Sequence, residues 1–362
     1  MLRAMRRAWL AIALGFVLFG TSGCPKKETL GAASMSVLGP GVINNPKNKS
    51  LRFDILKFGL ERFCFEMTRR GAPLKPSDDQ PVAGRFFADT CSQTVLDDDH
   101  RKSIIVQYTG KGYGWTNLTG RIGFTTAGLV EYAPDFQLHD DGSMYIYFRP
   151  RKVDSTNFTT LMVESNLARG GMSILNVKPD QIGRQIVDGQ LQRGFTVIRY
   201  NDKGETDFAL GYVPKGRKPF KPFVVSSEDK VTLVNDRTEV HTGQMDFIGG
   251  FELTDDDQAL YLTASIDGAP GVDAFLIPKF LGDQMIEQYV KHPGAAALPQ
   301  APLLDEALVA GQVWKRFVPA RKGVYYLVID HSAQVGRTAP PAQAGDDRAA
   351  KIDYVVQSGE RP

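Results

Sequence analysis

Residues 312–332 read QVWKRFVPARKGVYYLVIDHS and contain the clearest β pattern of the chain. The runs QVWKRFVP and VYYLVIDHS are rich in aromatic and β-branched residues, which favour strands. The polar ARKG between the two runs is typical of a turn. This segment therefore predicts two strands joined by a short connection.

The β pattern continues on both sides of this segment. The runs KVTLVN, QMDFIGGFEL, ALYLTASI and DAFLIP precede it from residue 224 onward, and KIDYVVQ follows a loop at 337–350. One helix is predicted here, over 283–292, where Pro293 closes it. The GVYYLVIDHS run resembles the late strand of jelly-roll-type sandwich modules found in exported bacterial proteins. The resemblance implies a β-sandwich over residues 224–362.

Residues 50–165 begin with a helix pattern and continue with short β runs. Apolar residues recur over 51–69 at steps of three and four, which line one face of a helix. Strand patterns follow at 103–108, 120–125, 129–132 and 143–149. In the last of these, positions 144–148 are all apolar or aromatic, which predicts a strand covered on both faces. We expect an α+β domain over 50–165. The apolar positions of the helix are Phe53, Leu56, Leu60, Phe63 and Met67.

Residues 166–223 predict a smaller α+β unit. A helix is expected after Pro179, and the runs FTVIRY and TDFALGYV flank NDKGE, a hairpin pattern. The basic stretch KGRKPFKP at 215–222 is either a solvated linker or a contact for anionic lipid or polysaccharide. Taken together, the chain is predicted to be an α+β protein, predominantly β, with a tethered body of several domains built from antiparallel sheets.

The N-terminus has the pattern of a secretory signal. Arg3, Arg6 and Arg7 precede an apolar run from Trp9 to Phe19, and small residues follow it. The run is shorter than the roughly 20 residues that a spanning helix needs. A membrane anchor or a buried core helix is the alternative interpretation.

The stretch TSGC, Thr21 to Cys24, resembles the lipobox of bacterial lipoproteins, with Thr21 where that family commonly has leucine. The resemblance implies a signal peptide over 1–23 and palmitate-type acylation of Cys24, followed by a flexible tether over 24–49. Pro25 stands where aspartate would favour the inner membrane, so the resemblance implies an outer-membrane protein held by its N-terminal lipid. Ordinary cleavage and secretion is the alternative.

Two cysteines remain after Cys24 is assigned to lipid. Cys64 and Cys91 would lie in an oxidising compartment, where disulfides persist, and an even pair predicts a disulfide bond. Closing such a loop stabilises a fold by about 3 to 4 kcal/mol in the chain-entropy model. A metal site and a pair of reduced core thiols are the alternatives.

Motifs for catalysis or metal binding are not found. The nearest approach to a nucleophile elbow, Gly171 to Leu175, lacks the final glycine, and the five histidines form no His-x-x-x-His pair. The acidic runs at 97–99, 140–141 and 255–257 fit calcium ligands or solvated turns, without the register of a calcium loop. We therefore expect no catalytic residues, metal or cofactor.

Aromatic residues near the glycine-rich TGKGYGW stretch are the candidates for a ligand surface. Tyr113, Trp115 and Tyr132 are residue types that carbohydrate-binding surfaces favour, and core packing is the alternative for all three.

The charge balance argues against nucleic acid as a partner, because 43 basic residues face 41 acidic ones. The sequence thus predicts an outer-membrane-anchored lipoprotein that is a non-catalytic binding or structural module of the cell envelope, with an envelope protein or glycan as partner. The alternatives are an exported hydrolase of polysaccharide or peptidoglycan, with two facing carboxylates, and a lipid or lipoprotein carrier, with an apolar cavity.

Overall fold

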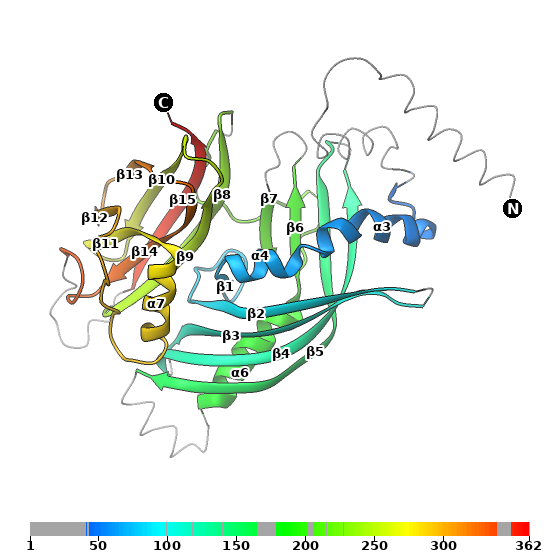
Figure 1. Ribbon diagram of the computed structural model, residues 1–362, viewed down its shortest axis with the longest axis horizontal. Coiled ribbons are helices and arrows are strands. Elements are labelled where there is room, and N and C mark those ends of the chain that lie inside the picture. Colours follow the sequence, from blue (N-terminus) through cyan, green and yellow to red (C-terminus); the bar gives the residue numbers. More distant parts are fainter. Residues whose placement is uncertain are drawn as a thin grey trace, which may run out of the picture.

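The computed structural model describes residues 41–361, apart from 42, 99, 118, 140, 165–178, 201–205, 215, 227 and 339–348. The predicted signal peptide, Cys24 and most of the predicted tether lie outside the described residues. The described chain is predominantly β, as predicted, with one seven-stranded and two four-stranded antiparallel sheets (Figure 1). Among its helices, none is long and apolar enough to cross a bilayer.

The seven-stranded sheet is an antiparallel meander in which each strand pairs with the next along the chain. Its long central strands curl into a half-barrel, as Figure 1 shows. Long strands curl in this way because each carries a right-handed twist and several carry bulges. The strands are β1 (Ala72–Leu74), β2 (Gly84–Asp97), β3 (Lys102–Thr116), β4 (Gly120–Leu138), β5 (Met144–Val163), β6 (Phe195–Arg199) and β7 (Thr206–Leu210).

Helices cover the concave face of this half-barrel. Helix α3 (Lys49–Leu60), which follows a short 3-10 turn at Pro46–Asn48, packs side chains into the same core as alternate residues of β3 and β4. Helix α6 (Pro179–Arg193) adds Val187 to that core and bridges β5 to β1, where Gln190 Nε2 donates to the Lys75 carbonyl over 2.9 Å. The concave face is therefore filled by side chains from both helices.

The single helix predicted over 51–69 is two helices in the structure. Helix α3 ends at Leu60, and α4 (Phe63–Arg69) begins after Arg62, whose backbone leaves the helical region. The break turns the second half of the apolar stripe toward β2. Cys64 of α4 forms the predicted disulfide with Cys91 of β2, with 5.2 Å between their Cα atoms. The bond fixes α4 to the sheet.

Strands β6 and β7 come from the stretch for which a separate small unit was predicted. Residues 195–199 of β6 pair antiparallel with 144–148 of β5, and β7 pairs with β6. They extend the half-barrel sheet, so we describe residues 41–213 as one half-barrel domain. The predicted boundary near 165 lies outside the described residues.

The C-terminal domain is a jelly roll, as the resemblance of GVYYLVIDHS implied. Its two sheets have the orders β13-β10-β15-β8 and β12-β11-β14-β9. Successive strands cross from one sheet to the other except between β11 and β12, which is the jelly-roll path. The strands are β8 (Lys230–Val240), β9 (Gln244–Leu253), β10 (Gln258–Asp267), β11 (Gly271–Pro278), β12 (Leu304–Val309), β13 (Trp314–Pro319), β14 (Gly323–His331) and β15 (Ala350–Glu360).

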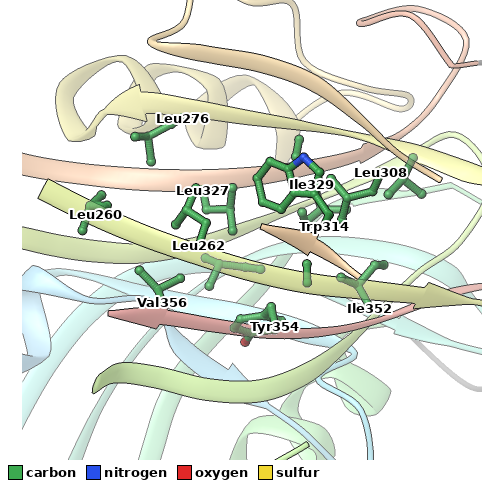
Figure 2. Close-up of a cluster of buried hydrophobic side chains, with 14 of the residues drawn as sticks. Leu260, Leu262, Leu276, Leu308, Trp314, Leu327, Ile329, Ile352, Tyr354 and Val356 are labelled. Atoms are coloured by element: carbon green, nitrogen blue, oxygen red, sulfur yellow. The ribbon is translucent and has the colours of Figure 1, made fainter. Parts of the chain in front are cut away.

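The core of the jelly roll lies between its sheets, where Figure 2 shows side chains from both layers meeting. Strand β14 supplies Leu327 and Ile329 to this core, while the alternate residues Tyr326 and Val328 face the opposite way. Helix α7 (Lys279–Tyr289) covers that second face and begins four residues before the predicted helix start. The run of apolar residues in β14 is thus explained: one face packs in the jelly-roll core and the other packs under α7.

Candidate functional site at the domain junction

The half-barrel packs on the jelly roll through the face of β2 and β3 that points away from α3. Phe87 of β2 meets Tyr326 of β14 edge to face at 6.0 Å, and Tyr113 of β3 meets Tyr289 of α7 at 4.9 Å. In Figure 1, α7 lies beside the ends of β2 and β3. Along β2 and β3, every second residue faces the concave core, and the residues between them build a second core between the two domains.

A buried ion pair joins the two domains at this junction. Arg85 of β2 donates to both carboxylate oxygens of Asp246 on β9, over 2.7 and 2.8 Å, and each side chain is 4% exposed. The same carboxylate accepts bonds from Tyr113 Oη at 2.7 Å and Thr238 Oγ1 at 2.8 Å. Arg85 also donates to Tyr354 Oη over 3.2 Å. Four donors therefore surround one buried carboxylate.

The network holds its members in fixed charge states. Burial works to raise the pKa of Asp246, but the Arg85 charge and the hydrogen bonds from Arg85, Tyr113 and Thr238 hold it below its ordinary value. Burial works to lower the pKa of Arg85, yet Asp246 keeps it well above its usual range. Burial and the Asp246 charge also raise the pKa of Tyr113 well above normal. None of the three is poised to exchange a proton near neutral pH.

A second arginine clamps the end of helix α7. Arg121 of β4 is 1% exposed and donates to the carbonyls of Tyr289 at 2.8 Å, His292 at 2.9 Å and Gly294 at 3.1 Å. Its guanidinium lies 3.6 Å from the Tyr289 ring and pairs with Glu164 at 3.1 Å. A cation on the carbonyls that follow a helix satisfies groups that the helix leaves unpaired. Arg121 therefore ties the half-barrel to α7.

Backbone also meets backbone at this clamp. A Cβ atom on Gly123 of β4 would lie 1.9 Å from the carbonyl oxygen of Val290. Only glycine permits this approach, because any other residue would displace one of the two chains. Beside the Arg85–Asp246 pair, Val82 forms an isolated parallel bridge with Thr238, whose hydroxyl donates to Asp246.

The three aromatic candidates do not share a surface. Tyr113 is 4% exposed inside the junction, and Trp115, two residues on, stacks on His241 of the jelly roll with 3.4 Å between ring centroids. Tyr132 is 5% exposed in the concave core, where it meets Phe63 and the Phe148 ring. Tyr113 and Trp115 lie on one face of the sheet and Tyr132 on the other. Burial of both tyrosines corresponds to the core-packing alternative.

Arg85, Asp246 and Arg121 were missed by sequence reasoning. Each is a charged residue within a strand, with apolar residues next to it, as in GRFF and MDFIGG. A charged side chain among apolar residues of a strand is buried only when it has a partner. The sequence therefore could have indicated that each of these residues is buried and paired. The partners are 161 residues apart for the Arg85 pair, so spacing gave no hint of them.

The described members of the acidic runs form ion pairs and hydrogen bonds with other parts of the protein. Asp97 pairs with Lys57 and Lys102, Asp141 accepts bonds from Ser143, and Asp256 accepts one from the Lys322 backbone. The described part of the chain holds no group of three His, Cys, Asp or Glu side chains arranged to hold a metal ion. Asp99 and Asp140 lie outside the described residues.

Within the part of the chain that the structure describes, two buried carboxyl groups face each other and neither forms an ion pair with a cation. Asp273 of β11 lies directly across from Asp330 of β14, and both are 0% exposed. Thr338 donates to Asp273 at 2.6 Å and Ser332 to Asp330 at 3.0 Å, so residues 332–338 cover the pair. Burial, and to a lesser degree the neighbouring Asp273, raises the pKa of Asp330 to about 8. The pair is sealed inside the domain.

Comparison with known proteins identifies no family. No family model matches the chain, and no curated protein matches it. Among solved structures it is similar to a chain of Bacillus endospore appendages, described as a novel family of disulfide-linked pili, at 7% identity over 40% of this chain and 100% of that one, with a TM-score of 0.21. It is also similar to chains of infectious bursal disease virus, Gx and Gt strains. Both are 11% identical with TM-scores of 0.21, over 83% and 80% of this chain and 76% and 75% of theirs. Likenesses at this level carry no argument about function.

Proposed function

We propose that this protein is a lipid-anchored, non-catalytic binding or structural module of the outer membrane. The observation that carries the proposal is the junction, in which Asp246 and Arg85 are buried and paired with each other. Such a network fixes the orientation of two domains and holds its groups away from proton exchange. This is the behaviour expected of a scaffold that presents two surfaces in a constant relation.

Two further observations support the proposal. The Cys64–Cys91 disulfide is of the kind that persists in exported proteins. The TSGC pattern at the N-terminus supports lipidation at Cys24. The proposed membrane contact is then made by lipid rather than by the folded domains.

The alternatives have less support from the described residues. A hydrolase needs carboxylates that a polymer can reach, whereas Asp273 and Asp330 are sealed under residues 332–338. A carrier needs an apolar cavity, whereas the concave face is filled, with Phe148 stacked on Phe195 at 4.3 Å.

Metabolic labelling tests the anchor. The full chain is produced in a didermic bacterium with an alkyne analogue of palmitate, beside Cys24→Ala and the double variant Cys64→Ser/Cys91→Ser. We expect label and outer-membrane fractionation for the wild type and the double variant, and neither for Cys24→Ala. Equal labelling of Cys24→Ala, or membrane retention without label, would overturn the lipid anchor.

A further inference from the structure

A group of tyrosines lies on the convex face of the half-barrel, at the β5–β7 end of the sheet. Met144, Ile146 and Phe148 of β5 pack into the concave core, so the alternate residues Tyr145 and Tyr147 point to the opposite face. There they form a small separate core with residues of β6 and β7. This face is not covered by α3, α4 or α6.

The outermost ring of this group is mounted on a rigid base. Tyr212 follows β7, is 53% exposed, and lies 4.6 Å from the ring of Tyr147, which is 4% exposed. The guanidinium of Arg149 lies 5.2 Å from the Tyr212 ring and 5.9 Å from the Tyr147 ring. A buried tyrosine and an arginine thus hold an exposed aromatic face in place, which lowers the entropy lost when a ligand binds it.

The basic connector brings more positive charge to the same face. Tyr145 Oη donates to the carbonyl of Arg217 over 3.1 Å, which ties the connector to the sheet. Arg217 and Lys218 are exposed, as is Arg149, and none of the three takes part in an ion pair within the described chain. Nearby Lys221, in contrast, pairs with Asp207 at 2.7 Å. We call Tyr147, Tyr212, Arg149, Arg217 and Lys218 the Tyr212 surface.

We propose that the Tyr212 surface binds an acidic polysaccharide, an inference that rests on the proposed role as a binding module. The exposed ring offers a flat face to the C–H face of a sugar, and arginines bind carboxylate, sulfate or phosphate groups through paired hydrogen bonds. An anionic membrane is the competing occupant. A membrane-inserting surface needs several exposed aliphatic or aromatic side chains. Of the two aromatic residues of the Tyr212 surface, only Tyr212 is exposed, since Tyr147 is buried.

Affinity electrophoresis of the purified mature chain tests the proposal. The gels contain polygalacturonate, dextran sulfate or neutral dextran, and co-sedimentation with vesicles of phosphatidylglycerol and phosphatidylcholine tests membrane binding. The variants are Tyr212→Ala and Arg149→Gln/Arg217→Gln. The matched controls are Phe317→Ala, which removes a 41% exposed ring of the jelly roll, and Lys315→Gln/Lys322→Gln, which removes the same charge from exposed sites. Thermal unfolding by circular dichroism confirms that each variant is folded.

We expect retardation by at least one acidic polymer and none by neutral dextran. Each Tyr212-surface variant should weaken binding about tenfold, whereas each control should change it less than about twofold. Equal losses in the variants and their matched controls would show that binding does not depend on the Tyr212 surface, and would overturn the proposal. Binding to anionic vesicles without retardation by either polymer would replace it with a membrane surface. If the protein neither is retarded by an acidic polymer nor binds vesicles, the proposed polysaccharide binding is overturned. The lipid anchor is unaffected by that result, because labelling of Cys24 tests it separately.

Discussion

Replacing Arg85 with methionine should destabilise the protein far more than removing a partly exposed ion pair within helix α7. The substitution leaves the Asp246 carboxylate, 4% exposed, with only the hydroxyls of Tyr113 and Thr238 as donors. Breaking a buried pair from one side costs about 3 to 5 kcal/mol, because an uncompensated charge stays buried. The matched control is Lys279→Met, whose partner Asp283 is 47% exposed, and it should cost about 0.5 kcal/mol or less.

A double-mutant cycle separates the pair from the loss of packing. Asp246→Asn should destabilise the protein as strongly as Arg85→Met, since it leaves the arginine buried without its counter-charge. The double variant should be less destabilised than the sum of the single variants by at least about 2 kcal/mol, because neither charge then remains.

Urea unfolding followed by tryptophan fluorescence measures these effects. Trp314 lies in the jelly-roll core, and Trp115 of β3 stacks on His241 across the junction. In a chain without residues 1–23, and so without Trp9, forms that retain one of these two tryptophans report the jelly roll and the junction separately. In the wild type the two transitions should coincide, and in Arg85→Met they should separate. A cost for Arg85→Met below about 1 kcal/mol, similar to Lys279→Met, or strict additivity in the cycle, would refute the reasoning.

Three other perturbations have defined outcomes. Replacing Cys64 and Cys91 with serine should lower the free energy of unfolding by about 3 to 4 kcal/mol, and a reducing agent should have no further effect on this variant in urea titrations. Gly123→Ala should raise the rate of hydrogen exchange in α7, because its Cβ would meet the Val290 carbonyl; unchanged exchange would contradict this close approach. The raised pKa of Asp330, about 8, means that the folded state keeps a proton that the unfolded chain releases above about pH 4. Stability should therefore fall between about pH 4 and 8, by at most about 1.4 kcal/mol per unit, and Asp330→Asn should flatten this slope; parallel profiles would exclude the effect.

Much of the jelly roll could be predicted because its information is local. Runs such as ALYLTASI and KIDYVVQ carry β-branched and aromatic residues between turn residues, and each became a strand, β10 and β15. Their order in the sheets could not be predicted in the same way. Strand β10 pairs with β13 and β15, and neither neighbour follows it directly along the chain. Pairing across such separations depends on which faces fit, which a single sequence does not display.

The predicted domain boundary near residue 165 shows the same contrast between local patterns and contacts that are distant in sequence. The β5 segment MYIYFR was predicted to be covered on both faces, which the structure bears out: Ile146 and Phe148 pack under the helices, and Tyr145 and Tyr147 lie in the separate core. The partners that cover it come partly from 195–213, beyond the helix α6. The local pattern therefore predicted the burial correctly, whereas the identity of the covering segment depended on contacts distant in sequence.

The aromatic residues near TGKGYGW and those on the Tyr212 surface show why residue type alone does not locate a site. Tyr113 lies in a strand with a domain on one side and a helix-covered core on the other, so its ring is buried and its hydroxyl is committed to Asp246. Tyr212 follows the last strand of the same sheet, where no second domain covers the convex face, so its ring remains 53% exposed. Both tyrosines lie beside arginines, Arg85 and Arg149 respectively. What separates a structural tyrosine from a candidate ligand contact is the position of its strand in the sheet, since the edge leaves charge and ring together in solvent.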